Sequence, residues 1–323
     1  MIVTVTLNAA VDRTLTVPNF QLGHRHRASA SLTSAGGKGI NVARALKELE
    51  APVIATGLAG GRAGDRIIEE LAGEAILNDF VRISDESRTS TAVVDPTAGR
   101  LSEIYEWGPA VRAEELEMLL DKLRYLSRVA SFVVFSGSLP RDVEDDFYAE
   151  AIRELNRRGV NCVLDCEGEP LRVGVEAEPF LVSPNQREAE SLVGQEFSDE
   201  EDFVMALDAI ADLGARNVLI TQETSCFGLF REDRQVRRFR ASVARIDPIH
   251  RSVPATCCSQ ASSPCVSTVA RSTRRFASAS APRPRRCSSS APAGSTSARR
   301  RASLPASSSK SSSPSPRSAA RSG

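Results

Sequence analysis

"SAGGKGINVARAL", residues 34 to 46, is the stretch of the sequence that says most about the fold. Adjacent glycines let backbone amides approach an anion, the helix-periodic residues that follow supply the positive end of a helix, and Lys38 adds a full charge. The stretch is not a Walker A loop, because Gly39 follows the lysine where Ser or Thr would bind Mg²⁺. The residues alone leave two interpretations open: an anion-binding loop, or a plain packing turn.

Short apolar runs and helix-periodic stretches alternate on both sides of this loop. The expected strands are "IVTVTL" (2–7), "PVIATGL" (52–58), "SFVVFSG" (131–137), "NCVLDC" (161–166), "PFLVSP" (179–184) and "NVLITQ" (217–222). The expected helices cover residues 40–50, 113–127, 145–159 and 200–214. Strands separated by helices indicate βαβ units, and therefore an α/β fold with a parallel sheet covered on both faces.

Two regions depart from this rhythm and alternate polar with apolar residues, as solvent-facing antiparallel strands do. They are "RTLTVP" (13–18) with "RASASLTS" (27–34), and "TSTAVVD" (89–95) with "RLSEIYE" (100–106) across the turn "PTAG". The pattern predicts a small β-sheet, with strands at about 13–34 and 89–106, that projects from the main domain as a lid over a ligand.

Charge is divided unevenly along the chain. All 41 acidic residues lie at or before Asp247, whereas 13 of the 41 Lys and Arg follow His250. The acidic first part argues against nucleic acid as a partner. The seven cysteines show no zinc-site spacing and do not suggest a secreted disulfide framework. Met1 leads directly into a strand, with no signal peptide and no membrane-spanning run, so the sequence predicts a cytoplasmic protein without a membrane partner.

Three polar residues near strand ends are further candidates. Asp12 follows the first strand, where a carboxylate could accept hydrogen bonds from sugar hydroxyls, although a helix cap or a turn is the alternative. Asn185 and Glu188 lie three residues apart at the start of a helix. That spacing suits Mg²⁺ ligation through water, and it equally suits an ordinary capping arrangement.

Taken together these motifs resemble the ribokinase-like (PfkB) family of carbohydrate kinases, and within it the 1-phosphofructokinase and tagatose-6-phosphate kinase branch. The matching pieces, in family order from Met1 to about Asp247, are "TLNAAVDRTLTV", "GGKGINVARALKELEAPVIATGLAGG", "SRTSTAVVDP", "FSGSLP", "LDCEGEPL" and "SPNQREAE". The resemblance implies a three-layer αβα sandwich with a mainly parallel central sheet and a β-sheet lid. It also implies ATP-dependent phosphorylation of a sugar or sugar phosphate with Mg²⁺, and a homodimer formed through the lids.

The resemblance also assigns residues to a sugar-phosphate pocket. They are Asp12, Gly37, Lys38, Asn41, Arg88 and Ser138. By motif, Asp12, Gly37 and Asn41 would hold sugar hydroxyls, and Ser138 would line the same pocket. Lys38 and Arg88 would bind the phosphate already on the sugar, which favours a phosphorylated substrate, most specifically fructose 1-phosphate.

The nucleotide side of the pattern is less complete. Asn185 and Glu188 would organise Mg²⁺ and the nucleotide phosphates, and Thr221 would lie beside the nucleotide. Ser183, however, stands where this branch has a lysine, and "TQETSCFG" (221–228) replaces a glycine-rich loop. In the lid, Tyr105 stands where an asparagine is usual. These departures bear on nucleotide affinity and on the identity of the sugar.

The catalytic Gly-x-Gly-Asp motif of the family does not occur in this chain. Its Asp would be the general base, and its helix N-terminus would stabilise the transferring phosphoryl group. Reading "RSVPATCCSQASSPC" (251–265) across codon borders permits Val-Gly-Ser-Gly-Asp followed by Val-Leu-Leu-Ala-Gly-Phe-Leu-Ala-Val. The third bases are chosen, so this is compatibility rather than proof. We interpret the change of composition as a frameshift.

The sequence therefore predicts a kinase domain over 1–247 that lacks its C-terminal part, followed by a Ser/Arg/Pro-rich, disordered tail over 248–323. The residues after His250 include 23 Ser and no acid. A natural basic tail that binds nucleic acid or membrane would explain that composition, but not the missing motif. The expected activity is a sugar-phosphate kinase that turns over poorly or not at all. The alternatives are a non-catalytic sugar-phosphate-binding pseudokinase and a misfolded fragment.

Overall fold

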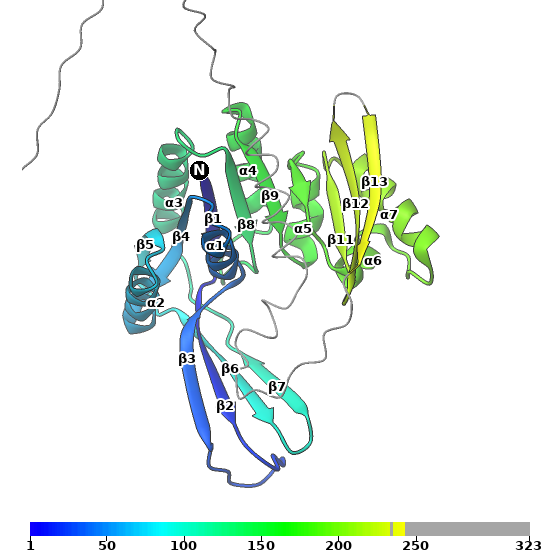
Figure 1. Ribbon diagram of the computed structural model, residues 1–323. Coiled ribbons are helices and arrows are strands. Elements are labelled where there is room, and N and C mark those ends of the chain that lie inside the picture. Colours follow the sequence, from blue (N-terminus) through cyan, green and yellow to red (C-terminus); the bar gives the residue numbers. More distant parts are fainter. Residues whose placement is uncertain (233–234, 243–323) are drawn as a thin grey trace, which may run out of the picture. The chain divides into compact units, whose positions relative to one another are not determined.

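The computed structural model describes residues 1–232 and 235–242, and it contains two β-sheets flanked by helices (Figure 1). The strands of the main sheet are β1 (Ile2–Thr6), β4 (Val53–Gly60), β5 (Leu77–Ile83), β8 (Phe132–Ser136), β9 (Asn161–Asp165), β10 (Leu181–Val182), β11 (Val218–Thr221), β12 (Ser225–Glu232) and β13 (Gln235–Ser242). The second sheet holds β2 (Ala10–Thr16), β3 (Ala30–Gly36), β6 (Arg88–Asp95) and β7 (Arg100–Tyr105).

The main sheet is parallel over most of its width. Its order is β13-β12-β11-β10-β9-β8-β1-β4-β5, and every pair from β5 to β11 is parallel. All residues of β1 and β8 are buried, as the continuous apolar runs of a strand covered on both faces require. In the described part of this sheet, only the β11–β12 and β12–β13 pairs at one edge are antiparallel, so β12 alone runs against the other strands. The central strands therefore bring their carboxyl ends to one side of the sheet.

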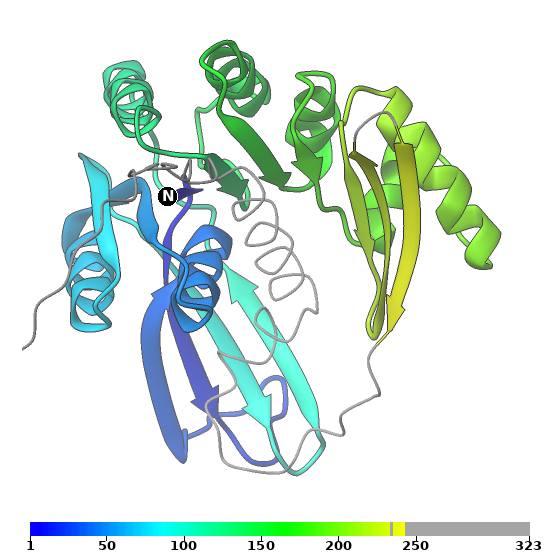
Figure 2. The same ribbon diagram turned by 45° about the horizontal axis from the view of Figure 1, so that its top comes forward.

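Helices cover both faces of the main sheet. They are α1 (Lys38–Glu48), α2 (Gly61–Gly73), α3 (Ala113–Leu126), α4 (Phe147–Arg157), α5 (Gly168–Val175), α6 (Gln186–Val193) and α7 (Glu200–Asp212). The apolar sides of α1 and α2 belong to one core cluster, and those of α3 to α7 belong to another. Figure 2 shows α1 and α2 on one side of the strands and α3, α4 and α5 in a row on the other. This is the expected three-layer αβα sandwich.

The second sheet is the expected lid, with a pairing that the sequence did not predict. Its order is β3-β2-β6-β7. The β2–β3 and β6–β7 pairs are antiparallel, as predicted, but β2 and β6 pair in parallel. A parallel pair needs a long crossover, and here the connection contains α1, β4, α2 and β5. The chain therefore leaves the lid after β3 to enter the main sheet, and it returns from β5 of the main sheet to the lid at β6.

The expected strands and helices all occur, with ends that differ by a few residues. The sequence missed α2, β5, α5 and the β12–β13 hairpin. The predicted boundary between residues 247 and 248, the missing motif and the tail all lie outside the described residues. Among the helices that the structure describes, none combines the length and the hydropathy needed to cross a bilayer.

Candidate functional site

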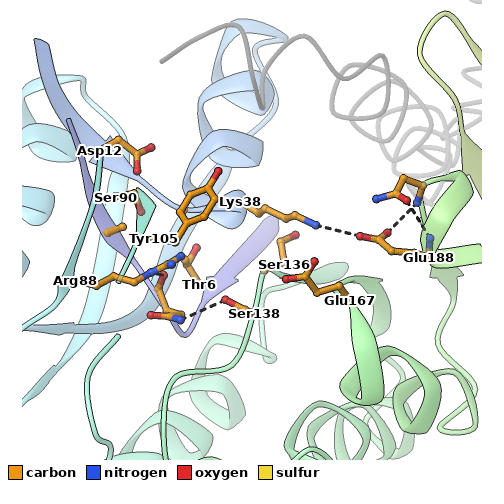
Figure 3. Close-up of a pocket in the computed structure, with 15 residues that line it drawn as sticks. Thr6, Asp12, Lys38, Arg88, Ser90, Tyr105, Ser136, Ser138, Glu167 and Glu188 are labelled. Atoms are coloured by element: carbon orange, nitrogen blue, oxygen red, sulfur yellow. Dashed lines mark hydrogen bonds and ion pairs between the residues drawn. The ribbon is translucent and has the colours of Figure 1, made fainter. Parts of the chain in front are cut away.

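A cavity of about 370 Å³ opens where the lid meets the carboxyl ends of β1 and β8 (Figure 3). Its walls come from β1, β2, α1, β6, β7 and the segments that follow β8, β9 and β10. The lining residues are Thr6, Asn8, Ala10, Asp12, Gly37, Lys38, Arg88, Ser90, Tyr105, Ser136, Gly137, Ser138, Glu167, Asn185 and Glu188. Parallel α/β sheets commonly bind ligands at this edge. Seven of the nine residues proposed from the sequence thus share one cavity.

The glycine-rich loop brings backbone, rather than side chains, against this cavity. Gly37 has a φ of 125°, which a residue with a side chain rarely adopts, and it caps α1 without a side-chain hydrogen bond. A Cβ on Gly36 would lie 2.2 Å from Cγ of Asp12, and a Cβ on Gly39 would lie 2.4 Å from Oγ1 of Thr6. The loop therefore packs closely against Asp12 and Thr6 and also places the N-terminus of α1 at the cavity. It has features of both the packing turn and the anion-binding loop that the sequence left open.

The lid contributes a row of three side chains. Asp12 of β2 is opposite Ser90 of β6, and Ser90 is opposite Tyr105 of β7. Residues opposite each other in a sheet point to the same face, so this register turns all three toward the cavity. Asp12 lies within a strand, which excludes the alternative of a helix cap. Burial raises the pKa of Asp12 to about 6, and the positive charge of Arg88 opposes that shift.

Arg88 lies at the base of the lid and is bonded to backbone oxygens. Its Nε donates to the carbonyl of Asn8 at 3.3 Å, and its Nη1 donates to the carbonyl of Glu106 at 3.3 Å. The Asn8 side chain in turn donates to Oγ of Ser138 at 3.2 Å. Burial lowers the pKa of Arg88, and Asp12 counteracts this. An arginine keeps its charge despite such a shift, so Arg88 presents a cation to the cavity.

Lys38 extends from α1 to the opposite end of the cavity, where carboxylates surround it. Its Nζ lies 3.3 Å from Oδ1 of Asp165. The same Nζ lies 3.9 Å from Oε1 of Glu188 (Figure 3). Burial would lower the pKa of Lys38, but Asp165 and Glu188 raise it above its usual range. Lys38 is therefore a protonated cation that is already partly neutralised by the protein.

Asn185 and Glu188 form a reciprocal capping box at the start of α6. The Glu188 amide donates to Oδ1 of Asn185 at 3.0 Å, and the Asn185 amide donates to Oε2 of Glu188 at 2.8 Å. The capping interpretation of this spacing is therefore correct. The same two residues also line the cavity, and the second Glu188 oxygen faces Lys38. Burial raises the pKa of Glu188, and Lys38 opposes that shift.

Comparison with known proteins shows the family to which the chain with this cavity belongs. Residues 3–227 match the model of the pfkB family carbohydrate kinases. The chain belongs to this family. It is similar to phosphofructokinase-2 from Escherichia coli in complex with fructose 6-phosphate, at 26% identity and a TM-score of 0.73 over 86% of this chain and 87% of that one. The tetrameric inhibited form of that enzyme matches at 27% identity and a TM-score of 0.67, over 73% of this chain and 78% of that one.

The chain is also similar to the solved structure of a possible 1-phosphofructokinase from Thermotoga maritima. It matches at 29% identity and a TM-score of 0.65, over 72% of this chain and 75% of that one. The family and the similar structures agree with the resemblance seen in the sequence. This PfkB protein is therefore a member of a family of phosphotransferases. The neighbours are phosphofructokinases, so the coarse function is that of a sugar kinase.

Two of the nine proposed residues do not line the cavity of this PfkB kinase. Asn41 lies one turn into α1, and its Oδ1 accepts a hydrogen bond from Nη1 of Arg44 at 3.2 Å. Thr221 is 5% exposed at the end of β11 and forms a parallel bridge with Asn185. Its amide donates to the carbonyl of Pro184 at 3.0 Å. Thr221 therefore lies beside the start of α6 rather than in the cavity.

Eight of the fifteen lining residues were not proposed from the sequence, and four of these eight have notable polar side chains. Thr6 and Ser136 are adjacent at the ends of β1 and β8, both are at most 2% exposed, and their hydroxyls have no partner. The Oδ1 atom of Asn8 is also buried without a partner. Glu167 lies at the N-terminus of α5 but makes no side-chain capping bond. Buried hydroxyls without partners are rare, so their position in a cavity is a signal that only the structure provides.

The groups around Glu188 offer few ligands to a divalent cation. Within residues 1–232 and 235–242, no cluster of three His, Cys, Asp or Glu side chains could hold a metal ion. Mg²⁺ in kinases commonly takes only one or two protein carboxylates and completes its shell with water and substrate phosphates. The Glu188 oxygen that faces Lys38, free of the cap, fits that limited role. The described residues therefore fit a Mg²⁺ ion that takes most of its ligands from water and substrate phosphates.

Proposed function

We propose that this chain is a 1-phosphofructokinase-like hexose kinase that binds fructose 1-phosphate in the cavity. The reaction is ATP-dependent phosphorylation of this sugar to fructose 1,6-bisphosphate. The observation that carries the proposal is the pair of cations, Lys38 and Arg88, in one cavity with the partly buried carboxylate of Asp12. Cations at both ends suit a phosphorylated sugar, and a carboxylate suits its hydroxyls.

In this proposal the substrate-binding roles stay as the sequence assigned them, except for that of Asn41. Asp12 and Gly37 contact sugar hydroxyls, Ser138 lines the pocket, and Arg88 and Lys38 bind phosphate. Asn41 acts from the first turns of α1 through the Gly37 loop, since its amide donates to the Gly37 carbonyl at 3.0 Å. Arg88 is the stronger phosphate ligand of the two cations, because the charge of Lys38 is shared with Asp165 and Glu188.

ATP and Mg²⁺ belong on the α6 side of the cavity. Glu188 would hold the ion through water, Asn185 would fix Glu188 through the capping box, and Thr221 would line the nucleotide side. Mg²⁺, when bound, neutralises charge on the nucleotide phosphates. The capping box supports this assignment, because it fixes the Glu188 carboxylate with one oxygen toward the cavity.

Loss of turnover is the second part of the proposal. The sequence contains no Gly-x-Gly-Asp stretch, so neither the general base nor the helix N-terminus of that motif is supplied. This favours an alternative function for the chain as it stands: a non-catalytic sugar-phosphate-binding pseudokinase. Binding without turnover fits this alternative, whereas turnover excludes it.

The test is calorimetric titration of the 323-residue chain with fructose 1-phosphate, fructose 6-phosphate, tagatose 6-phosphate and fructose, together with a coupled assay for ADP release. We expect tightest binding for fructose 1-phosphate and no measurable ADP release. Ser138→Ala tests the pocket wall, and Ser127→Ala, at the end of α3 outside the cavity, is its control. Equal affinity for all four sugars would contradict the substrate, and rapid ADP release would contradict the loss of turnover.

A second experiment addresses the reading frame. Sequencing the source DNA across codons 245 to 270 shows whether the codons permit the alternative reading. A version that carries Val-Gly-Ser-Gly-Asp and its following helix in place of the residues from Arg251 onward is then assayed beside the original. We expect ADP release only from the restored version. Codons that are incompatible with the alternative reading would contradict the frameshift.

A homodimer through the lids is also proposed. Every residue of β7 is exposed, and the lid carries exposed apolar side chains at Leu32, Leu101 and Ile104. Such side chains favour burial against another surface. Light scattering on the purified chain tests the proposal, with Ile104→Lys expected to shift a dimer to a monomer. A wild-type monomer at all concentrations would contradict it.

A further inference from the structure

Tyr105 is an aromatic residue at the wall of a polar cavity. It is the last residue of β7, and the row that it shares with Ser90 and Asp12 points it inward (Figure 3). Its side chain remains 53% exposed, so the ring is not part of either core cluster. An aromatic ring that is left open toward a sugar-sized cavity offers an apolar face to whatever enters.

Arg88 lies against this ring. Its guanidinium carbon is 6.0 Å from the Tyr105 ring centre, a separation typical of a cation–π contact. The other contacts of Arg88 are hydrogen bonds to the carbonyls of Asn8 and Glu106. In the described part of the chain, no carboxylate forms an ion pair with Arg88. Two carbonyls and one aromatic face therefore fix the guanidinium without neutralising it.

This arrangement differs from that of Lys38. Lys38 is held by carboxylates, so an incoming phosphate must compete with Asp165 and Glu188 for its charge. Arg88 is hydrogen-bonded only to neutral groups among the described residues, and Asp12 acts on it without forming an ion pair, so its remaining N–H groups stay available to an anion. The hydroxyl of Tyr105 also stays neutral at physiological pH, because burial raises its pKa to about 12. Tyr105 thus adds no negative charge beside the guanidinium.

We propose that Tyr105 is a positioning and specificity-determining residue: its ring holds Arg88 in the orientation that selects a phosphorylated sugar over the free sugar. The inference rests on the proposed function and deepens it. The ring acts through Arg88, so its effect falls on the phosphate of the ligand more than on the sugar hydroxyls. The face of the Tyr105 ring, rather than its hydroxyl, sets the preference for the phosphorylated sugar.

The chain offers a matched control for this pair. At the C-terminal end of α3, the guanidinium carbon of Arg128 lies 5.8 Å from the ring centre of Tyr125, and Tyr125 is 65% exposed. This is the same pair of residue types at nearly the same separation, remote from the cavity. Tyr125→Ala therefore removes an equivalent contact without touching the candidate site.

The experiment is calorimetric titration of the full chain and its variants with fructose 1-phosphate and with fructose, after circular dichroism has shown native secondary structure. For Tyr105→Ala we expect fructose 1-phosphate affinity to fall on the order of tenfold, within the range of desolvated cation–π contacts. The affinity for fructose should change by less than about threefold, because fructose carries no phosphate for Arg88 to bind. Tyr105→Phe should bind as the wild type does, and so should Tyr125→Ala.

Each other outcome overturns a specific statement. Equal losses for fructose and fructose 1-phosphate in Tyr105→Ala would show a simple wall contact and overturn the selectivity. A loss in Tyr105→Phe as large as in Tyr105→Ala would place the effect on the hydroxyl and overturn the role of the ring. Unchanged affinity in Tyr105→Ala would overturn the inference while the proposed function stands. A wild-type chain that binds neither sugar would overturn the proposed function itself.

Discussion

The ammonium group of Lys38 lies 3.3 Å from the carboxylate of Asp165, although Lys38 is the residue that the glycine-rich loop presents for an anion. Glu188 adds a second carboxylate at 3.9 Å. The charge of this lysine is therefore shared between the protein and any phosphate that enters. The two ends of the cavity differ accordingly: carboxylates form ion pairs with Lys38, whereas none of the described carboxylates forms an ion pair with Arg88.

Asp165→Asn tests this competition. The substitution keeps the shape of the side chain and removes its charge, so the pKa of Lys38 falls toward its ordinary value and its charge becomes available to the ligand. Because the pair is partly exposed, we expect a modest gain of roughly three- to tenfold in fructose 1-phosphate affinity. Asp121→Asn, which removes a carboxylate paired with Arg124 on α3, is the control. Unchanged affinity in Asp165→Asn would mean that Lys38 does not contact the phosphate.

Gly36→Ala should displace the Asp12 carboxylate. The added methyl group would lie 2.2 Å from Cγ of Asp12, a separation that requires one of them to move. We expect sugar affinity to fall at least about tenfold and stability to fall by about 1–3 kcal/mol, as for other overpacking substitutions. Gly73→Ala in α2 is the control, because nothing lies within 4 Å of the added methyl group. It should stabilise the helix by up to about 1 kcal/mol. Calorimetry and urea unfolding measure the two effects.

The pKa of about 6 for Asp12 predicts a pH dependence of sugar binding. An ionised carboxylate accepts two hydrogen bonds from hydroxyls more strongly than a protonated one does. Affinity for fructose, which has no phosphate group that titrates in this range, should therefore weaken as the pH falls from 7 to 5, and Asp12→Asn should lose this dependence near pH 6. A wild-type affinity that is constant between pH 7 and 5 would contradict the participation of Asp12.

The same shift has the opposite sign for stability. The pKa of Asp12 is higher in the folded protein than its ordinary value of 3.8, so between the two values the folded state binds more protons than the unfolded state. The contribution of Asp12 therefore destabilises the fold as the pH rises from about 4 to 6. The stability gained by Asp12→Asn relative to the wild type should be larger at pH 7 than at pH 4.5. Urea unfolding at both values measures it, and an equal gain at both would contradict the raised pKa.

The sequence predicted the strands and helices of the αβα layers better than the long-range pairing between strands. Apolar runs such as "SFVVFSG" (131–137) identify buried parallel strands because burial on both faces leaves no alternation. The β12–β13 hairpin was missed because its first strand was interpreted as part of a replaced nucleotide loop. The β2–β6 pair was missed because its partners are brought together only by the α1–β5 crossover. Local periodicity carries no information on such long-range pairing.

Within the site, motif residues were predictable and their partners were not. Lys38 and Arg88 were proposed from the sequence, but the Asp165 carboxylate and the Tyr105 ring that distinguish them come from distant segments. The spacing of Asn185 and Glu188 fitted both a cap and an ion site, and the structure shows the cap directly. Thr6 and Ser136 gave no sequence signal, because hydroxyl residues within a strand usually find a partner.

Asn185→Ala separates the two roles of the capping box. Removal of the Asn185 acceptor should destabilise the protein by about 1 kcal/mol, the usual effect of losing an N-cap. The control is Asp199→Ala, because Asp199 forms the same type of capping box with Asp202 at the start of α7. Both variants should lose similar stability in urea unfolding. Only Asn185→Ala should weaken binding of a non-hydrolysable ATP analogue with Mg²⁺, since only that box fixes a carboxylate that faces the cavity. Equal nucleotide affinity in the two variants, or no nucleotide binding by the wild type, would leave Asn185 and Glu188 with a capping role alone.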